Sequence, residues 1–143
     1  MIRLANPNDV DDIASLGLEF VEKSMSAHTF EPNLGKLWEL FHTAATGSEF
    51  ILIVLEEESR VVGFIFGMIL APCFSEEVVL QEVGMYVQTG FSGLHLLDAF
   101  EREAEIRGIK KVVVGCKPGF CDLGNYYKRK GYKLLEVQYL KEI

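Results

Sequence analysis

Apolar residues recur every three or four positions in four stretches of the chain, which is the pattern of amphipathic helices. The first helix follows Asn6, with Pro7 at its first position and Asp9 three residues after the cap. This is a capping-box arrangement. The other helices are expected near 33–45, over 92–107 and over 122–130. The second carries its apolar stripe at Leu34, Leu37, Trp38 and Phe41.

Stretches with strand-like composition separate these helices. They lie at 2–5, 49–57, 60–71, 77–87, 109–116 and within 132–141. The resulting order, β-α-α-β-β-β-α-β-α-β, is typical of a mixed three-layer α/β fold. The strand at 109–116 is expected to lie parallel to the strand at 77–87, with the 92–107 helix as a right-handed crossover.

Composition favours one soluble domain over residues 1–143. Hydrophobic residues make up 49% of the chain and charged residues 24%, which is enough apolar material for one core. The formal net charge of −7 disfavours binding to nucleic acid or to an anionic membrane surface. The chain begins without an apolar leader pattern, and its longest apolar run, 61–74, is too short for a bilayer. We therefore expect a cytoplasmic protein with no nucleic-acid or membrane partner.

The cysteines predict neither a disulfide framework nor a metal site. There are three of them, at Cys73, Cys116 and Cys121. The spacing of the last two is not a usual zinc pattern, and the histidines lie far from them in sequence. No metal is therefore expected.

The connection between the strand at 77–87 and the helix at 92–107 is the first candidate site. It reads "QTGFSG" at 88–93. Backbone N–H groups at a helix start attract an anion, glycines allow its close approach, and Ser92 is a good N-cap. Two interpretations stay open, a strand-to-helix turn with glycines for steric reasons or a cradle for a phosphate.

Glu82 is the second candidate, because a carboxylate within the apolar strand "VVLQEVGMYV" is costly to bury unless it is paired or hydrated. Alternation places Glu82, Gly84 and Tyr86 on one face and the residues between them on the other. Gly84 would leave room for a ligand or water. Glu82 is either a general base or a solvated or lysine-paired carboxylate.

The element order, "QTGFSG" and "NYYKRKGY" at 125–132 are together similar to the GNAT superfamily of acyl-CoA-dependent N-acyltransferases. The resemblance covers nearly the whole chain. The family's loop reads Arg or Gln, x, x, Gly, x, Gly or Ala. Gln88 and Gly93 match its first and last positions, whereas Phe91 stands at the middle glycine and Gly90 precedes it. The family's residues between the strand and the loop are missing here.

The resemblance implies acetyl-CoA as a co-substrate and no metal. It implies Glu82 as general base and Tyr127 as the acid that protonates the leaving thiolate. Without the resemblance, Tyr127 reads as a core aromatic residue. The expected acetyl-CoA contacts are Tyr86, Val87, Gln88, Gly90, Ser92 and Gly93.

The acceptor is expected to be a primary amine of a small molecule or a protein. His28, Phe30 and Phe74 are the candidate acceptor contacts. Only 12 residues follow Gly131, room for one long strand or two very short ones. The acceptor wall is then either open or completed by a second copy in a homodimer.

Three functions are compatible with these residues. An active N-acetyltransferase is favoured by Glu82 and Tyr127 together. The irregular loop favours two alternatives: a non-catalytic acyl-CoA-binding protein, or an interaction module that has lost the cofactor.

Overall fold

The computed structural model of the chain describes residues 1–24, 30–116 and 123–143. The elements in chain order are β1 (Ile2–Leu4), η1 (Pro7–Asp9), α1 (Val10–Ser24), α2 (Leu34–Thr46), β2 (Phe50–Glu57), β3 (Arg60–Leu70), β4 (Val79–Val87), α3 (Leu96–Ile106), β5 (Val112–Val113) and α4 (Gly124–Arg129). Among the described residues, no helix is long and apolar enough to cross a membrane.

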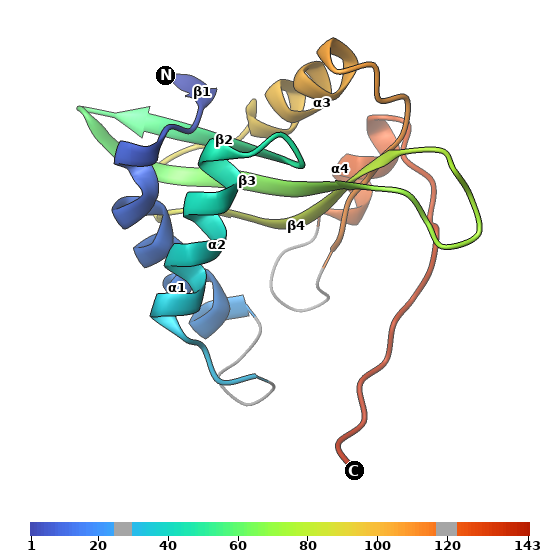
Figure 1. The fold of residues 1–143 in the computed structure, drawn as a ribbon, viewed down its shortest axis with the longest axis horizontal. Helices are drawn as coiled ribbons and strands as arrows, with labels where there is room; N and C mark the ends of the chain where they lie inside the picture. Colours follow the sequence, from blue (N-terminus) through green and yellow to red (C-terminus); the bar gives the residue numbers. More distant parts are fainter. Residues whose placement is uncertain (25–29, 117–122) are drawn as a thin grey trace.

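The sheet has the strand order β1-β2-β3-β4-β5. Its first four strands pair antiparallel and β5 pairs parallel to β4, as expected for a crossover through α3. Helices α1 and α2 cover one face and α3 lies on the other, with α4 beside it (Figure 1). The predicted three-layer α/β fold class is confirmed.

Each face of the sheet has its own hydrophobic core. Leu52 and Val54 of β2 pack under α1 and α2. Ile51 and Ile53, which alternate with them, pack under α3. Because both faces are covered, β2 and β3 read as nearly continuous apolar runs rather than as alternating ones.

Two predicted elements differ from the structure at the C-terminal side. Residues 132–143 form no strand. After Tyr132, which packs against the core, they run in extended form with exposed side chains, because no strand of the described chain pairs with them. β5 is paired over two residues only, since the chain diverges from β4 after Val113.

The second helix is rotated relative to its predicted stripe. Phe41 and Ala44 are its buried residues, whereas Leu34 and Trp38 are 49% and 40% exposed. The Trp38 indole N–H donates to Asp11 Oδ1 at 2.8 Å. This bond satisfies the polar end of the ring, so Trp38 lies at the edge of the α1–α2 contact rather than in it.

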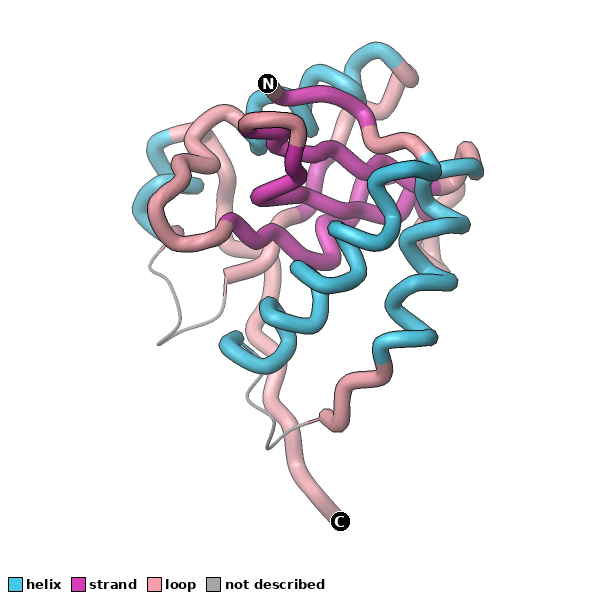
Figure 2. Tube along the Cα trace, turned by 90° about the vertical axis from the view of Figure 1, so that its left-hand side faces the viewer, coloured by secondary structure: helices cyan, strands magenta, loops and turns pink. Residues whose placement is uncertain are grey.

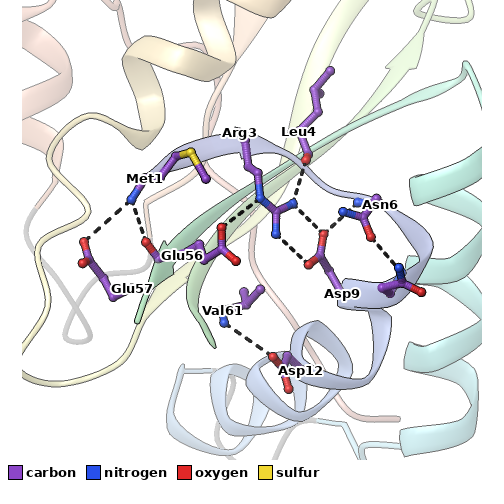
Figure 3. Close-up of polar contacts among 10 residues, drawn as sticks. Met1, Arg3, Leu4, Asn6, Asp9, Asp12, Glu56, Glu57 and Val61 are labelled. Atoms are coloured by element: carbon purple, nitrogen blue, oxygen red, sulfur yellow. Dashed lines mark hydrogen bonds and ion pairs between the residues drawn. The ribbon is translucent and has the colours of Figure 1, made fainter. Parts of the chain in front are cut away.

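The N-terminus of α1 is held by a partly buried ion pair (Figure 3). Asn6 and Asp9 form the predicted capping box, in which Asn6 N donates to Asp9 Oδ2 at 2.8 Å. Arg3 on β1 donates two hydrogen bonds to the Asp9 carboxylate, at 2.8 and 2.9 Å, and a third to Glu56 at 3.2 Å. These bonds hold the start of the helix against β1 at the edge of the sheet. They also lower the pKa of the Asp9 carboxyl.

Asp9→Asn is expected to lower the free energy of unfolding at pH 7 by roughly 2 kcal/mol, the scale of a hydrogen bond to a charged group. Because the pKa of Asp9 is lowered in the folded protein, its stabilisation is present above the ordinary value of 3.8 and is lost as the pH falls through the folded value. Urea unfolding at several pH values measures this. Glu105→Gln, the same charge change at an exposed helix position, is the control; an equal loss in both variants would contradict the assignment.

Candidate functional site

A gap opens in the sheet between β4 and the segment that follows β5. The two strands pair only at Leu80 with Val112 and at Gln81 with Val113. β4 continues to Val87 along β3, but no pairing with β5 follows it. Among the described residues, the ladder between β4 and β5 therefore ends at Gln81, and the two strands diverge beyond it.

A bulge in β4 changes the predicted face of Glu82. Phe66 pairs with Gly84 and Gly67 with Glu82, so Val83 is an extra residue. Leu80 and Met85 accordingly belong to the same core although they are five residues apart. The predicted sharing of a face by Glu82, Gly84 and Tyr86 was wrong, because the inserted residue shifts the alternation between them.

The structure brings Glu82 and Tyr127 to the backbone of the same residue, Gly115. Gly115 N donates to Glu82 Oε2 at 2.9 Å, and Tyr127 OH donates to Gly115 O at 3.0 Å. Glu82 thus crosses the gap from β4, and Tyr127 reaches its other wall from α4. The sequence gives no sign of Gly115, because nothing in its neighbourhood marks it as the meeting point.

Tyr127 is also part of the core that α3 covers. It is 7% exposed, and its ring centroid lies 5.6 Å from that of Tyr132. Tyr132 OH donates to Glu101 on α3 at 2.6 Å, and burial together with this bond raises the pKa of Tyr132. The packing role foreseen for Tyr127 is therefore present alongside a hydroxyl directed at Gly115.

The 88–93 connection is built on a tight turn. Phe91 N donates to Gln88 O at 3.2 Å, and Gly90 has φ of +94°. A positive φ at the third residue of a β-turn requires glycine or a residue of similar freedom. The family's loop has its middle glycine at the position of Phe91, whereas this chain has the glycine at position 90. The turn explains this difference, because it requires a positive φ at position 90.

Gly93 is fixed by packing. A Cβ atom on it would lie 2.6 Å from Val87 Cγ2, so the turn folds closely onto the end of β4. This supports the steric interpretation for Gly93 itself. Within the described part of the chain, the N–H groups of Gly90, Ser92 and Gly93 have no acceptor, which leaves three donors on one short loop.

The predicted N-cap at Ser92 was wrong. α3 begins at Leu96 with His95 as N-cap, after a turn in which Leu96 N donates to Gly93 O at 3.0 Å. Ser92 Oγ instead accepts from Leu94 N at 3.4 Å. Residues 92–95, which were predicted to be helical, therefore form a turn and loop before α3.

A polar cluster beside the end of β4 was missed by the sequence reasoning. Tyr86 OH donates to Glu19 Oε2 at 2.9 Å and accepts from Lys23 Nζ at 3.1 Å. Gln88 Nε2 approaches Glu19 Oε1 at 3.4 Å, and the Tyr86 bond raises the pKa of Lys23. The signal available was the four-residue spacing of Glu19 and Lys23 on one helix face.

The three acceptor candidates are not brought together. His28 lies outside the described residues. Phe30 and Phe74 are 55% and 88% exposed. The chain just before α2 and the β3–β4 connection, which hold these phenylalanines, lie at opposite sides of the molecule in Figure 1. Phe30 and Phe74 therefore cannot line one pocket in this conformation.

Of the described residues, none form a group of three His, Cys, Asp or Glu side chains that could hold a metal ion. The chemistry open to this region is that of one carboxylate, one phenol and a loop of backbone donors. These groups suit proton transfer and the binding of an anion.

Several solved structures that share the fold of this chain are named acetyltransferases. A ribosomal-protein-alanine N-acetyltransferase from Brucella melitensis biovar Abortus 2308 aligns with 100% of this chain and 99% of its own, at a TM-score of 0.72 and 16% identity. A predicted acetyltransferase from Clostridium acetobutylicum, solved with acetyl-CoA, aligns over 99% and 95% of the two chains at a TM-score of 0.74 and 16% identity.

An aminoglycoside acetyltransferase from an uncultured soil metagenomic sample, solved with trehalose, aligns over 100% of this chain and 95% of its own. Its TM-score is 0.74 and its identity 17%. No protein-family model and no curated protein matches the chain. The chain has the GNAT fold over its whole length.

Proposed function

We propose that this GNAT-fold chain is an N-acetyltransferase that moves an acetyl group from acetyl-CoA to a primary amine of a small molecule or a protein. The observation that carries the proposal is the opened gap between β4 and β5, with Glu82 and Tyr127 both hydrogen-bonded to the backbone of Gly115 beside it. A carboxylate and a phenol at one open strand edge are the acid and base that amine acylation needs.

The phosphates of acetyl-CoA would lie at the 88–93 loop. The N–H groups of Gly90, Ser92 and Gly93 are available there, and the nearby start of α3 adds the positive end of its dipole. Gln88 and the backbone of Val87 would continue this contact toward the gap, whereas the backbone of Tyr86 faces β3. The side chain of Gln88 is held by Glu19, so its contribution is more structural than the resemblance alone implies.

Acetyl-CoA supplies the activated acetyl thioester; the chain supplies position and proton transfer. Glu82 would take the proton that the amine loses, directly or through water. Tyr127 would give a proton to the sulfur of the departing thiolate, and a backbone N–H of β4 that faces the gap, such as that of Val87, would stabilise the carbonyl oxygen. The N–H of Tyr86, expected for this role, faces β3 instead: Tyr86 lies opposite Phe64, two residues before Gln88, whose N donates to Val62 O at 2.9 Å. The net charge of −7 favours a cationic acceptor.

A second candidate function has a specific observation behind it. Both Glu82 and Tyr127 hydrogen-bond the backbone of Gly115, which is also what purely structural residues would do. A protein that binds acyl-CoA without turnover is therefore the alternative. The two functions share the loop and differ in whether the Glu82 carboxylate is required.

Ser92→Asp is expected to weaken acetyl-CoA binding at least tenfold, on the order of 1.4 kcal/mol. Ser92 is exposed, and its side-chain oxygen already accepts from Leu94 N. An aspartate can keep this turn, so the change mainly adds a negative charge beside the expected pyrophosphate. Isothermal titration calorimetry measures the affinity.

Ser92→Asn is the matched control, because asparagine can make the same turn without the charge. It should bind acetyl-CoA within a few-fold of the unmodified chain. Gly93 is unsuitable for this test, since any side chain there meets Val87. Equal affinities of the Asp and Asn variants would remove the pyrophosphate from this loop.

A further inference from the structure

The segment from Lys133 to Ile143, here named the C-terminal segment, is extended and apolar, and it leaves the body of the protein. It descends from the region of α4 to an end far from the sheet in both views (Figures 1 and 2). Its large apolar side chains are between 63% and 118% exposed. So many exposed large apolar side chains on one short segment are unusual for a monomer and mark a contact surface.

The C-terminal segment has the pattern of a half-buried strand. Leu135, Val137 and Tyr139 occupy one face, and Glu136 and Gln138 lie between them. Strict alternation over these residues fits a strand with one face on a core and one in water. The predicted strand at 132–141 is thus encoded in the sequence but has no partner strand in the described chain.

Among the described strands, β5 forms one edge of the sheet, and an added strand would fit there. β5 is the last strand in the sheet order. Lys111 O accepts from Leu80 N on β4, so the backbone groups of Val112 and Val114, which alternate with Lys111 and Val113, point to the other side. An unpaired row of N–H and C=O groups is a template for an added strand.

The chain holds the start of the C-terminal segment in place. Tyr132 packs against Tyr127 and donates to Glu101 on α3. Lys130 pairs with Asp98 and Glu101. These contacts hold the chain in place as far as Tyr132. The C-terminal segment therefore leaves the body of the protein from a fixed point.

We propose that the C-terminal segment of one copy adds to the β5 edge of a second copy as an antiparallel strand, and that the exchange is reciprocal. A reciprocal exchange gives a closed dimer with two-fold symmetry, in which the β5 edge of each copy is paired. The segment carries two positive and two negative side chains, so it approaches the acidic body without net repulsion.

Charge favours the antiparallel direction. Lys110 and Lys111 lie just before β5, where Lys111 pairs with Glu77 at 2.7 Å, and Glu142 stands near the end of the C-terminal segment. Antiparallel pairing brings these opposite charges to the same end of the ladder, whereas parallel pairing brings Lys133 there instead. Opposite charges across strands stabilise a pair and like charges destabilise it.

The test compares the full-length chain with Val137→Pro by sedimentation equilibrium at micromolar concentrations. Proline removes an N–H in the middle of the added strand but lies in an exposed part of the protein, so the melting temperature of the body should change little. We expect a dimer for the unmodified chain, a monomer for Val137→Pro, and a dimer for the control Val137→Thr, which keeps a strand-forming residue.

Carbodiimide cross-linking of a dimer mixed from ¹⁴N and ¹⁵N copies identifies the edge. We expect links from Glu142 of one copy to Lys110 or Lys111 of the other. A monomeric unmodified chain, a dimer that survives Val137→Pro, or links that join only the two C-terminal segments would each overturn the proposal. Because no ligand is present in these measurements, their outcome is independent of the proposed acetyl transfer.

Discussion

Glu82→Gln is expected to lower kcat about 10²-fold and to leave the affinity for acetyl-CoA nearly unchanged. The amide oxygen of glutamine can still accept from Gly115 N, where Glu82 Oε2 now accepts at 2.9 Å, so the bridge across the gap is kept. What is lost is the group that takes the proton. Initial rates against pH, with a panel of amines and with acetyl-CoA binding measured in parallel, give the two numbers separately.

Glu82→Ala is the companion variant, because it removes both the base and the bridge. If Glu82 is only a structural residue, the glutamine variant will be as active as the unmodified chain and the alanine variant alone will be impaired. If Glu82 is the base, both will lose turnover. A responsive amine turned over at full rate by Glu82→Gln would exclude the catalytic role of this carboxylate.

Phe100→Ala is expected to cost about 3–5 kcal/mol of unfolding free energy, as for other buried phenylalanines. Phe100 is 0% exposed and its ring tip lies over Gly67, where an added Cβ would be 2.4 Å from Phe100 Cζ. The ring fills the space that Gly67 leaves and sets the height of α3 above the sheet. Urea unfolding measures the loss.

Phe74→Ala is the matched control, since Phe74 is 88% exposed and should lose well under 1 kcal/mol. Because α3 positions the loop before it, Phe100→Ala should also weaken acetyl-CoA binding in conditions where the variant is folded. A cost near that of Phe74→Ala would contradict the described contact between α3 and β3.

The regular part of the fold was predictable from the sequence because its signals are local. The capping box at Asn6 and Asp9 depends on residues three apart, and Gly108 and Gly131 both have positive φ just past helix ends. The β2–β3 hairpin likewise follows from two apolar runs around a short polar turn. In each case the hydrogen-bonding partners are neighbours in the chain, so the pattern contains them.

The site was predictable only in its residues and not in their geometry. The bulge at Val83 depends on how β3 and β4 pair, and the alternation of one strand cannot reveal it. The start of α3 was predicted too early because Ser92 is a good N-cap when judged from the local sequence alone. In the structure Gly93 packs closely against Val87, and the helix begins only after the turn that follows this contact. The meeting of Glu82 and Tyr127 at Gly115 joins residues 33 and 12 positions away from it.

The C-terminal segment shows another kind of failure: the strand predicted within 132–141 is absent from the structure, although the sequence has the pattern of a strand. Leu135, Val137 and Tyr139 encode a strand face. A strand needs a partner for its backbone, and the described part of the chain offers none to these residues. Local propensity is therefore insufficient to form the element without another edge.

The most direct test of acetyl-CoA binding is a thermal-shift titration of the unmodified chain. Binding to the folded state alone must stabilise it, by about 2.7 kcal/mol at a ligand concentration 100 times Kd. We expect the melting temperature to rise continuously with acetyl-CoA concentration, and to rise less with acetyl-pantetheine, which lacks the pyrophosphate. No rise at millimolar acetyl-CoA would contradict both the proposed acetyltransferase and the acyl-CoA-binding alternative.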